Sequence, residues 1–262
     1  KDFHVCYSPE RINPGDKKNS LTKINKIVAY EGNNTVIKKK LFNVYSKLSK
    51  KIIFTDKIKE AETAKAIENI QRDLNISFFN EILLICSKLN LNFNEVVKLA
   101  KSKWNFLEFS PGLVGGHCLP VDPYYLTYVA KKYNYASKVT LSGRYTNNYI
   151  KNYVLQFVKK KINNNCMKKQ KIKICVLGLT YKYGVADTRN SQKIEIYNIL
   201  KKKYKNTTGY DPFLKEKNYF SKIKIKNSNY FLFLTKGEIY KKIFKKLNKN
   251  QVIDPFLYYL NK

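Results

Sequence analysis

A cysteine beside two glycines is the residue of this sequence best suited to covalent chemistry. Cys118 follows Gly115, Gly116 and His117, and Asp122 lies four residues further on. The glycines lack a Cβ, so the backbone there can take positive φ and come close to a ligand. Only a thiolate attacks, and a free cysteine with a pKa near ~8.5 is mostly protonated at neutral pH. If Cys118 acts as a nucleophile, a nearby cation or hydrogen-bond donor must assist it.

Lys65 and Asn69 are well placed by spacing to give that assistance. They are four residues apart in the segment 61–76, whose pattern is helical, and therefore share one helix face. Such a pair can offer an ammonium and an amide to a reacting oxygen. An ordinary solvated helix face has the same pattern, and for a single Lys/Asn pair the residues alone favour this simpler interpretation.

A long central helix must position this pair. Apolar residues recur at three- and four-residue steps, which predicts a helix of roughly 45 Å. The stripe comprises Ile67, Ile70, Leu74, Phe78, Ile82, Ile85 and Leu89. It fits a helix buried in the core and a helix at a two-fold interface equally well.

The other elements alternate between strands and helices at both ends of the chain. Residues 1–56 predict the end of a parallel α/β sheet, with strands at 3–7, 26–30 and 51–56 and a helix at 34–48. The middle predicts further helices near 93–103, 123–133 and 141–161, followed by a polar linker at 163–170. Apolar runs at 171–180, 206–212 and 229–235 then predict strands, with a helix that begins at Asn190 or Ser191.

The composition narrows the functional classes. The formal net charge of +32 over 262 residues would suit a nucleic-acid-binding protein. The charge is nearly all lysine spread along the chain, and arginine, which base recognition favours, is scarce, so we expect no nucleic-acid partner. The five cysteines lack CxxC spacing and indicate neither a disulfide framework nor a zinc site. The sequence contains no signal peptide or membrane-length apolar run, and we expect a cytoplasmic protein without membrane contact.

Three long motifs in one order resemble the UDP-glucose/GDP-mannose dehydrogenase family. They are the cysteine motif Gly-Gly-His-Cys-Leu-Pro-Val-Asp-Pro-Tyr-Tyr-Leu, the helical segment 61–76 and the opening segment 7–16. With Lys103-Trp-Asn-Phe106, the chain is most similar to the UDP-N-acetylhexosamine 6-dehydrogenases, which act on UDP-N-acetylglucosamine and UDP-N-acetylgalactosamine in surface-polysaccharide synthesis. The resemblance extends over nearly the whole chain.

The resemblance implies a four-electron oxidation of the sugar C6 hydroxyl to a carboxylate, with two NAD molecules accepting hydride in turn. Cys118 would form a thiohemiacetal and then a thioester. Lys65 and Asn69 would stabilise negative charge on the C6 oxygen, and Asp122 would relay protons and orient water. Glu10 would help to handle water or protons near C6.

Four further residues receive roles from the same resemblance. Gly115, Gly116 and Lys182 would contact the nucleotide sugar, and Arg189 would contact NAD. His117 stays outside the catalytic set.

Some family positions leave alternatives open. Asp122 before Pro123 is equally typical of a helix N-cap, and Glu10 could be a turn carboxylate paired with Arg11. Pro14 stands where UDP-glucose enzymes have a second glutamate. Val121 stands where they have a lysine, a departure shared with the N-acetylhexosamine group. The gluco, galacto or manno configuration of the substrate is not encoded in any motif.

The implied fold class is α/β, in three domains. Residues 1–58 would be the remnant of an NAD-binding Rossmann-like domain, 59–162 an all-α dimerisation domain, and 163–262 a UDP-sugar-binding Rossmann-like domain. The G-x-G-x-x-G turn that seats the NAD pyrophosphate does not occur in these residues, and the chain opens as if inside a strand, so we interpret it as a fragment. The alternative function is a non-catalytic remnant that forms a homodimer and binds UDP-sugar but not NAD.

Overall fold

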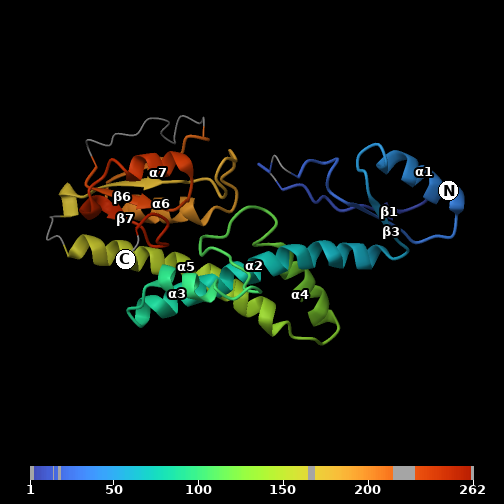
Figure 1. The fold of residues 1–262 in the computed structure, drawn as a ribbon, viewed down its shortest axis with the longest axis horizontal. Helices are drawn as coiled ribbons and strands as arrows, with labels where there is room; N and C mark the ends of the chain where they lie inside the picture. The colour runs from blue at the N-terminus through green and yellow to red at the C-terminus, as the bar shows by residue number, and fades with distance from the viewer. Residues whose placement is uncertain (1–2, 14, 17–18, 165–168, 215–227, 261–262) are drawn as a thin grey trace.

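The computed structural model describes residues 3–13, 15–16, 19–164, 169–214 and 228–260. Two α/β parts lie at opposite ends of a layer of helices (Figure 1). This confirms the predicted α/β fold with a helical middle. The expected linker at 163–170 falls partly on residues outside the described ranges.

The N-terminal part is a three-stranded sheet with order β1-β2-β3. It contains β1 (Cys6–Tyr7), β2 (Lys26–Tyr30), α1 (Thr35–Tyr45) and β3 (Ile52–Thr55). β2 and β3 are parallel as predicted, but β1 has two residues instead of five and runs antiparallel to β2. The prediction of a purely parallel sheet was therefore wrong at this edge, because an apolar run indicates a strand but not the direction of its neighbour.

The middle of the chain forms the helical layer. Its members are α2 (Ile58–Lys88), α3 (Phe93–Ala100), α4 (Asp122–Lys132) and α5 (Lys138–Asn163). α5 runs beneath the C-terminal sheet, and α2 extends from there to the N-terminal sheet (Figure 1).

The residues that α2 buries are not those that the sequence predicted. Of the predicted apolar stripe, Ile70 is buried, whereas Ile67, Phe78 and Leu89 are 52%, 51% and 63% exposed. The helix instead buries four polar residues at three- and four-residue steps, which are Asn69, Asp73, Ser77 and Asn80. A helix buries polar groups only where they find hydrogen-bond partners, so this face must be matched by polar groups elsewhere in the chain.

The C-terminal part is a parallel sheet of order β5-β4-β6-β7. Its elements are β4 (Lys173–Leu177), α6 (Gln192–Lys203), β5 (Asn206–Tyr210), β6 (Tyr230–Phe233), α7 (Glu238–Phe244) and β7 (Val252–Ile253), with short 3₁₀ turns at Lys169–Lys171 and Lys249–Gln251. Neither α7 nor β7 was predicted. The near-continuous apolar runs of β4 and β6 are buried on both faces, as is usual for parallel strands.

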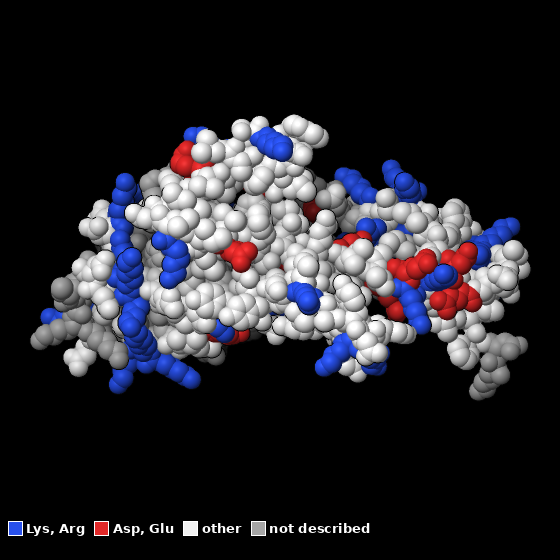
Figure 2. Space-filling model, turned by 90° about the horizontal axis from the view of Figure 1, so that it is seen from below, with Lys and Arg blue, Asp and Glu red and all other residues white. Residues whose placement is uncertain are grey.

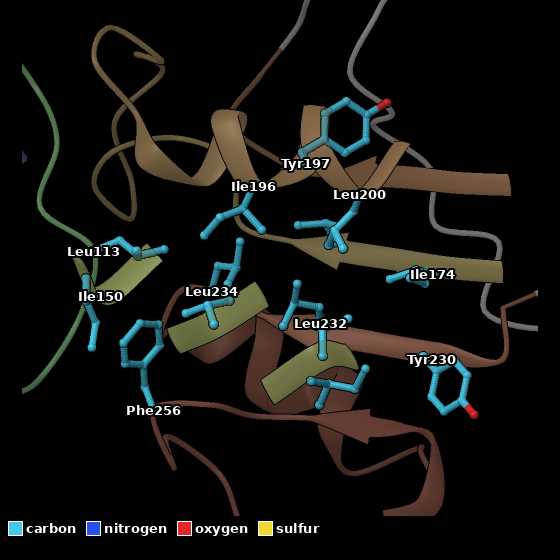
Figure 3. Close-up of a cluster of buried hydrophobic side chains, with 14 of the residues drawn as sticks. Leu113, Ile150, Ile174, Ile196, Tyr197, Leu200, Tyr230, Leu232, Leu234 and Phe256 are labelled. Atoms are coloured by element: carbon cyan, nitrogen blue, oxygen red, sulfur yellow. The ribbon is translucent and has the colours of Figure 1, made fainter. Parts of the chain in front are cut away.

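The core of this part includes residues from outside its own sheet. Figure 3 shows Ile174 of β4 and Leu232 of β6 beside Ile196 and Leu200 of α6. Leu113, five residues before Cys118, belongs to the same buried cluster, as does Ile150 of α5. The loop that carries Cys118, residues 109–119 and called the cysteine loop below, is thus anchored in the core of the C-terminal part.

Candidate active site

One cavity of about 560 Å³ brings together residues from four separate segments. They come from the strap at residues 11–13, from α2, from the cysteine loop, and from the turn after β4. The lining residues are Arg11, Ile12, Asn13, Lys65, Glu68, Asn69, Arg72, Ile76, Leu113, Val114, Gly115, Gly116, His117, Cys118, Leu119, Tyr181 and Lys182. Cys118, Lys65, Asn69, Gly115, Gly116 and Lys182, all singled out from the sequence, therefore share one cavity.

The α2 side of the cavity carries a residue that sequence reasoning missed. Arg72 lies one turn beyond Asn69, and its guanidinium donates to Asn69 Oδ1. Asn69 Nδ2 in turn donates to Asp122 Oδ2 at 2.5 Å. The amide of Asn69 is thus held from both ends, which leaves its second N–H free of these two bonds. The signal for Arg72 was present in the spacing, since positions 65, 69, 72 and 76 follow one helix face.

Asp122 is positioned by the start of α4. Val121 is the N-cap residue and Pro123 stands in the first turn, and no side chain caps the helix. The alternative in which Asp122 is the N-cap was therefore wrong, because Val121 holds that position. The Asp122 carboxylate instead accepts a hydrogen bond from Asn69. Asp122 does not itself line the cavity but contacts a residue that does. Burial, and to a lesser degree the charges of Glu62 and Asp122, raise the pKa of Tyr7.

Of the two adjacent glycines of the cysteine loop, only Gly116 takes the predicted positive φ. Gly116 has a φ of +90°, but Gly115 does not take positive φ. Gly115 is needed for space instead, because a Cβ there would lie 2.9 Å from the carbonyl oxygen of Asn190. The Gly116 N–H donates to the carbonyl of Arg189 at 3.1 Å, and Asn190 Nδ2 donates to the Gly116 carbonyl at 3.2 Å. Cys118 follows two residues later and is exposed.

Arg189 lies beside the cavity but does not line it. Its guanidinium donates to Asp187 Oδ2 at 2.7 Å and holds the pKa of that carboxyl below its usual value. His117 links this pair to the cavity, because its Nδ1 lies 3.9 Å from Asp187 Oδ2 and its Nε2 lies 3.5 Å from Arg189 Nη2. The Arg189 side chain remains largely exposed and open to a ligand.

The strap at 11–13 closes one side of the cavity. Arg11 forms an ion pair with Glu68 at 2.6 Å, so the alternative in which Arg11 pairs with Glu10 was wrong. The Glu10 carboxylate accepts from the Ile12 N–H at 2.6 Å and does not line the cavity. At the other end of the strap, Lys182 Nζ donates to Asn13 Oδ1 at 2.7 Å. Pro14 lies outside the described residues.

The cavity is electrostatically positive. Four cations line it, Arg11, Lys65, Arg72 and Lys182, whereas Glu68 is the carboxylate among the lining residues. Burial lowers the pKa of Lys182, and the nearby Arg72 lowers it further. An anionic ligand would relieve the repulsion that lowers the pKa of Lys182, so the cavity suits a negatively charged compound.

A second cavity, of about 310 Å³, lies on the other side of the cysteine loop. Residues 109–111 of the loop line it, together with α3 and residues 256–258. Three lysines are part of its wall, Lys98, Lys101 and Lys236, and Lys101 is ion-paired at 2.6 Å with Glu108 of the same wall. Lys236 and residues 256–258 follow the carboxyl ends of β6 and β7, which is where ligands bind in open parallel sheets.

The described residues hold no metal-binding cluster, and the helix end that follows β2 is already capped. Among them, no three His, Cys, Asp or Glu side chains come together in a way that could hold a metal. The turn between β2 and α1 would be the natural pyrophosphate site. There the Asn34 side chain already accepts from the N–H groups of Val36 and Ile37. None of the described helices is both long and apolar enough to cross a bilayer.

Comparisons with known proteins give a consistent result. Residues 59–149 match the central domain of the UDP-glucose/GDP-mannose dehydrogenase family, and residues 175–258 match its UDP binding domain. The chain is 43% identical over 212 residues to Protein CapL of Staphylococcus aureus. It is 42% identical over 215 residues to UDP-N-acetyl-D-glucosamine 6-dehydrogenase of Salmonella typhi. These alignments cover 80% and 82% of this chain, which spans about half the length of each relative (50%).

Solved structures agree with the sequence comparison. The UDP-N-acetyl-mannosamine dehydrogenase Cap5O from S. aureus superposes with a TM-score of 0.77 at 30% identity, over 91% of this chain and 56% of that one. The UDP-D-ManNAc dehydrogenase from Pyrococcus horikoshii superposes with a TM-score of 0.81 at 26% identity, over 96% and 59%. With both domain models matched in order, and with the cysteine loop and the face of α2 meeting in one cavity, the chain belongs to the UDP-glucose/GDP-mannose dehydrogenase family.

Proposed function

We propose that this chain provides the sugar-oxidising site of an NAD-dependent UDP-N-acetylhexosamine 6-dehydrogenase of surface-polysaccharide synthesis. The observation that carries the proposal is the single cavity in which Cys118 of the loop meets Lys65 and Asn69 of α2. The names of the relatives support the substrate class, since they include both N-acetylglucosamine and N-acetylmannosamine enzymes.

In this proposal Cys118 forms a covalent bond with C6 once the sugar is at the aldehyde level. The thiolate adds to the carbonyl carbon, a C–S bond forms, and the carbonyl oxygen becomes negatively charged. The ammonium of Lys65 and the second N–H of Asn69 stabilise that oxygen, because both line the cavity with Cys118. Asp122, held against Asn69 at 2.5 Å, takes up the thiol proton directly or through water.

The same residues serve the hydrolysis of the thioester formed after the second oxidation. Water adds to the thioester carbon, the C–S bond breaks, and the Cys118 thiolate is released with the C6 carboxylate as product. Asp122, which has passed the thiol proton to solvent, accepts one proton of the attacking water, and the second leaves the carboxylic acid for solvent. Glu10 lies outside the cavity, and its proposed part is to order water at the strap.

The hydride acceptor of the family is NAD, and these residues fit it only in part. Arg189 is exposed at the edge of the site and is the described residue that we assign to NAD. The pyrophosphate needs a glycine-rich turn at a free helix N-terminus, and the end of α1 is occupied by Asn34. The sequence has no G-x-G-x-x-G turn, and we assign no residue of this chain to the NAD pyrophosphate.

The second cavity, with Lys98, Lys101 and Lys236 in its wall, is the place we assign to the uridine diphosphate. Its wall comes from the C-terminal part, whose residues 175–258 match a UDP binding domain. Lys236 and Lys98 there complement the phosphates, Lys101 does so in exchange for Glu108, and the cysteine loop runs from this cavity to the one that contains Cys118. A nucleotide sugar bound along the loop has its phosphates at Lys98, Lys101 and Lys236 and its C6 carbon at Cys118.

We also propose a cytoplasmic homodimer. Several large apolar side chains on the helices are more than half exposed, including Phe78 of α2, Tyr125 and Tyr128 of α4, and Tyr145 of α5. Charged side chains are sparse over the middle of the face seen in Figure 2. A second copy that covers these side chains removes them from water.

The test is oxidation of UDP-N-acetylglucosamine by the purified chain with NAD, followed by NADH absorbance and by mass spectrometry of the uronic acid. UDP-N-acetylgalactosamine and UDP-N-acetylmannosamine are assayed in parallel to assign the configuration. NADH formation that is lost in Cys118→Ser supports the proposal. Protection of Cys118 from iodoacetamide by UDP-N-acetylglucosamine tests substrate binding without any cofactor.

The second candidate function is a non-catalytic remnant that dimerises and binds UDP-sugar. The observation in its favour is the missing pyrophosphate turn. It predicts protection of Cys118 by the nucleotide sugar without NADH formation, and activity that returns when an NAD-binding domain of a relative is supplied. Absence of both protection and activity contradicts both functions.

A further inference from the structure

We infer that Asn80 is a positioning residue that sets the place of Cys118 by holding the cysteine loop, residues 109–119, at Gly112. Asn80 is fully buried on the polar side of α2. Its Nδ2 donates to the Gly112 carbonyl at 3.0 Å, and its Oδ1 accepts from the Gly112 N–H at 2.8 Å. The inference deepens the proposed function, on which its catalytic meaning rests.

Gly112 is the point at which the loop passes from one cavity to the other. Residues 109–111 line the lysine-walled cavity, and residues 113–119 line the cavity that contains Cys118. Gly112 lines neither of them. A shift at Gly112 therefore changes the spacing between the two cavities, and with it the distance a bound nucleotide sugar must span.

The loop is tied a second time, at Gly116, by another asparagine. Asn190 Nδ2 donates to the Gly116 carbonyl at 3.2 Å, and the Arg189 carbonyl accepts from the Gly116 N–H at 3.1 Å. Asn80 belongs to the helical layer, whereas Asn190 precedes α6 of the C-terminal part. Cys118 lies two residues beyond the second tie, so its position is determined by both parts of the molecule.

The orientation of the Asn80 amide is fixed by a buried network. Its second Nδ2 hydrogen goes to Asn147 Oδ1 at 2.8 Å. Asn147 Nδ2 donates to Asp73 Oδ1 at 2.8 Å, and Arg144 forms an ion pair with Asp73 at 2.6 Å. Both Nδ2 hydrogens of Asn80 are used, and its Oδ1 accepts from Gly112. A carboxylate in its place would face the Gly112 carbonyl and Asn147 Oδ1 with an acceptor where both need a donor.

The competing explanation is that Asn80 only satisfies buried backbone groups and contributes to stability alone. Thermal stability cannot separate the two explanations, since loss of a buried amide lowers it in either case. The state of Cys118 does separate them. In the same molecule, Cys6 is an exposed thiol on β1 that serves as an internal reference, while Cys86 and Cys175 are buried.

The experiment compares Asn80→Asp with wild type and with Val158→Ala, a control that removes buried volume from α5 at a residue that lines neither cavity. Each protein is treated with iodoacetamide over a series of UDP-N-acetylglucosamine concentrations, and alkylation at Cys118 and Cys6 is measured by peptide mass spectrometry. We expect Asn80→Asp to need about tenfold more nucleotide sugar for half-protection of Cys118, equal to about 1.4 kcal/mol. Alkylation of Cys6 should not change, and Val158→Ala should behave as wild type.

The inference is overturned if Asn80→Asp and Val158→Ala lose similar thermal stability while Cys118 keeps the wild-type half-protection concentration. If Asn80→Asp does not fold, Asn80→Ser replaces it, because the shorter side chain loses the two bonds to Gly112 without placing a carboxylate against the Gly112 carbonyl. If the nucleotide sugar does not protect wild-type Cys118, the proposed substrate is wrong. The positioning role of Asn80 is then tested by the alkylation rates measured without nucleotide sugar. If the ratio of the Cys118 rate to the Cys6 rate is the same in all variants, that role is refuted.

Discussion

Replacing Lys193 by methionine should change how the free energy of unfolding depends on pH. Lys193 is only 5% exposed, at the start of α6. Its Nζ donates to the Thr180 carbonyl at 3.0 Å and to Thr235 Oγ1 at 2.6 Å. Burial lowers the pKa of Lys193 to about 8, although the charge of Asp211 opposes the shift. The bond to Thr180 lies two residues before Lys182, so this ammonium also supports a wall of the candidate active site.

The sign and size follow from the two pKa values. The ordinary lysine value is 10.5, so between about pH 8 and 10.5 the unfolded chain binds more protons at this residue than the folded chain. The free energy of unfolding then rises with pH in that window. The full shift corresponds to about 3.4 kcal/mol, and about 2 kcal/mol of it falls between about pH 7.5 and 9.5.

The assay is urea unfolding followed by circular dichroism at several pH values in that range. Groups common to both proteins cancel in the difference between wild type and Lys193→Met, including Tyr240 and Tyr258, whose pKa values are raised by burial. Between about pH 7.5 and 9.5, the free energy of unfolding of the wild type should rise by about 2 kcal/mol relative to that of the variant. Lys201→Met, on the exposed side of the same helix, should give a flat difference. A flat difference for Lys193→Met would refute the argument, since it would mean an ordinary, hydrated lysine.

Three further outcomes are expected. Arg144→Met should lower the free energy of unfolding by about 3–5 kcal/mol, because it leaves the buried carboxylate of Asp73 without its cation, and adding Asp73→Leu should recover most of that loss in urea melts. Cys118→Ser should lower uronic acid formation at least about 100-fold in the complete enzyme while nucleotide-sugar binding by calorimetry stays within about twofold, and unchanged turnover would exclude the covalent route. Phe78→Glu should shift the proposed dimer toward monomer in light scattering, with the dissociation constant raised at least about tenfold; an unaltered dimer would place the interface elsewhere.

The local sequence was sufficient for the parts of this protein that depend on near neighbours. The spacing of Lys65 and Asn69 places both on one helix face, and both line one cavity. The apolar runs of β4 and β6 are buried strands in a parallel sheet, because residues with both faces covered need not alternate. The three motifs together also indicated the family, which the comparisons confirm.

Tertiary structure alone decided which side of α2 is buried. The apolar period predicted a stripe from Ile67 to Leu89, yet the helix buries Asn69, Asp73 and Asn80. Their partners outside α2, including Asp122, lie 32 to 74 residues away in the chain. A periodic pattern reports on neighbours within one or two turns, whereas a buried amide is stable only if a distant group completes its hydrogen bonds. The meeting of Cys118 with Lys65 has the same origin, because only folding brings together a loop and a helix face that are far apart in sequence.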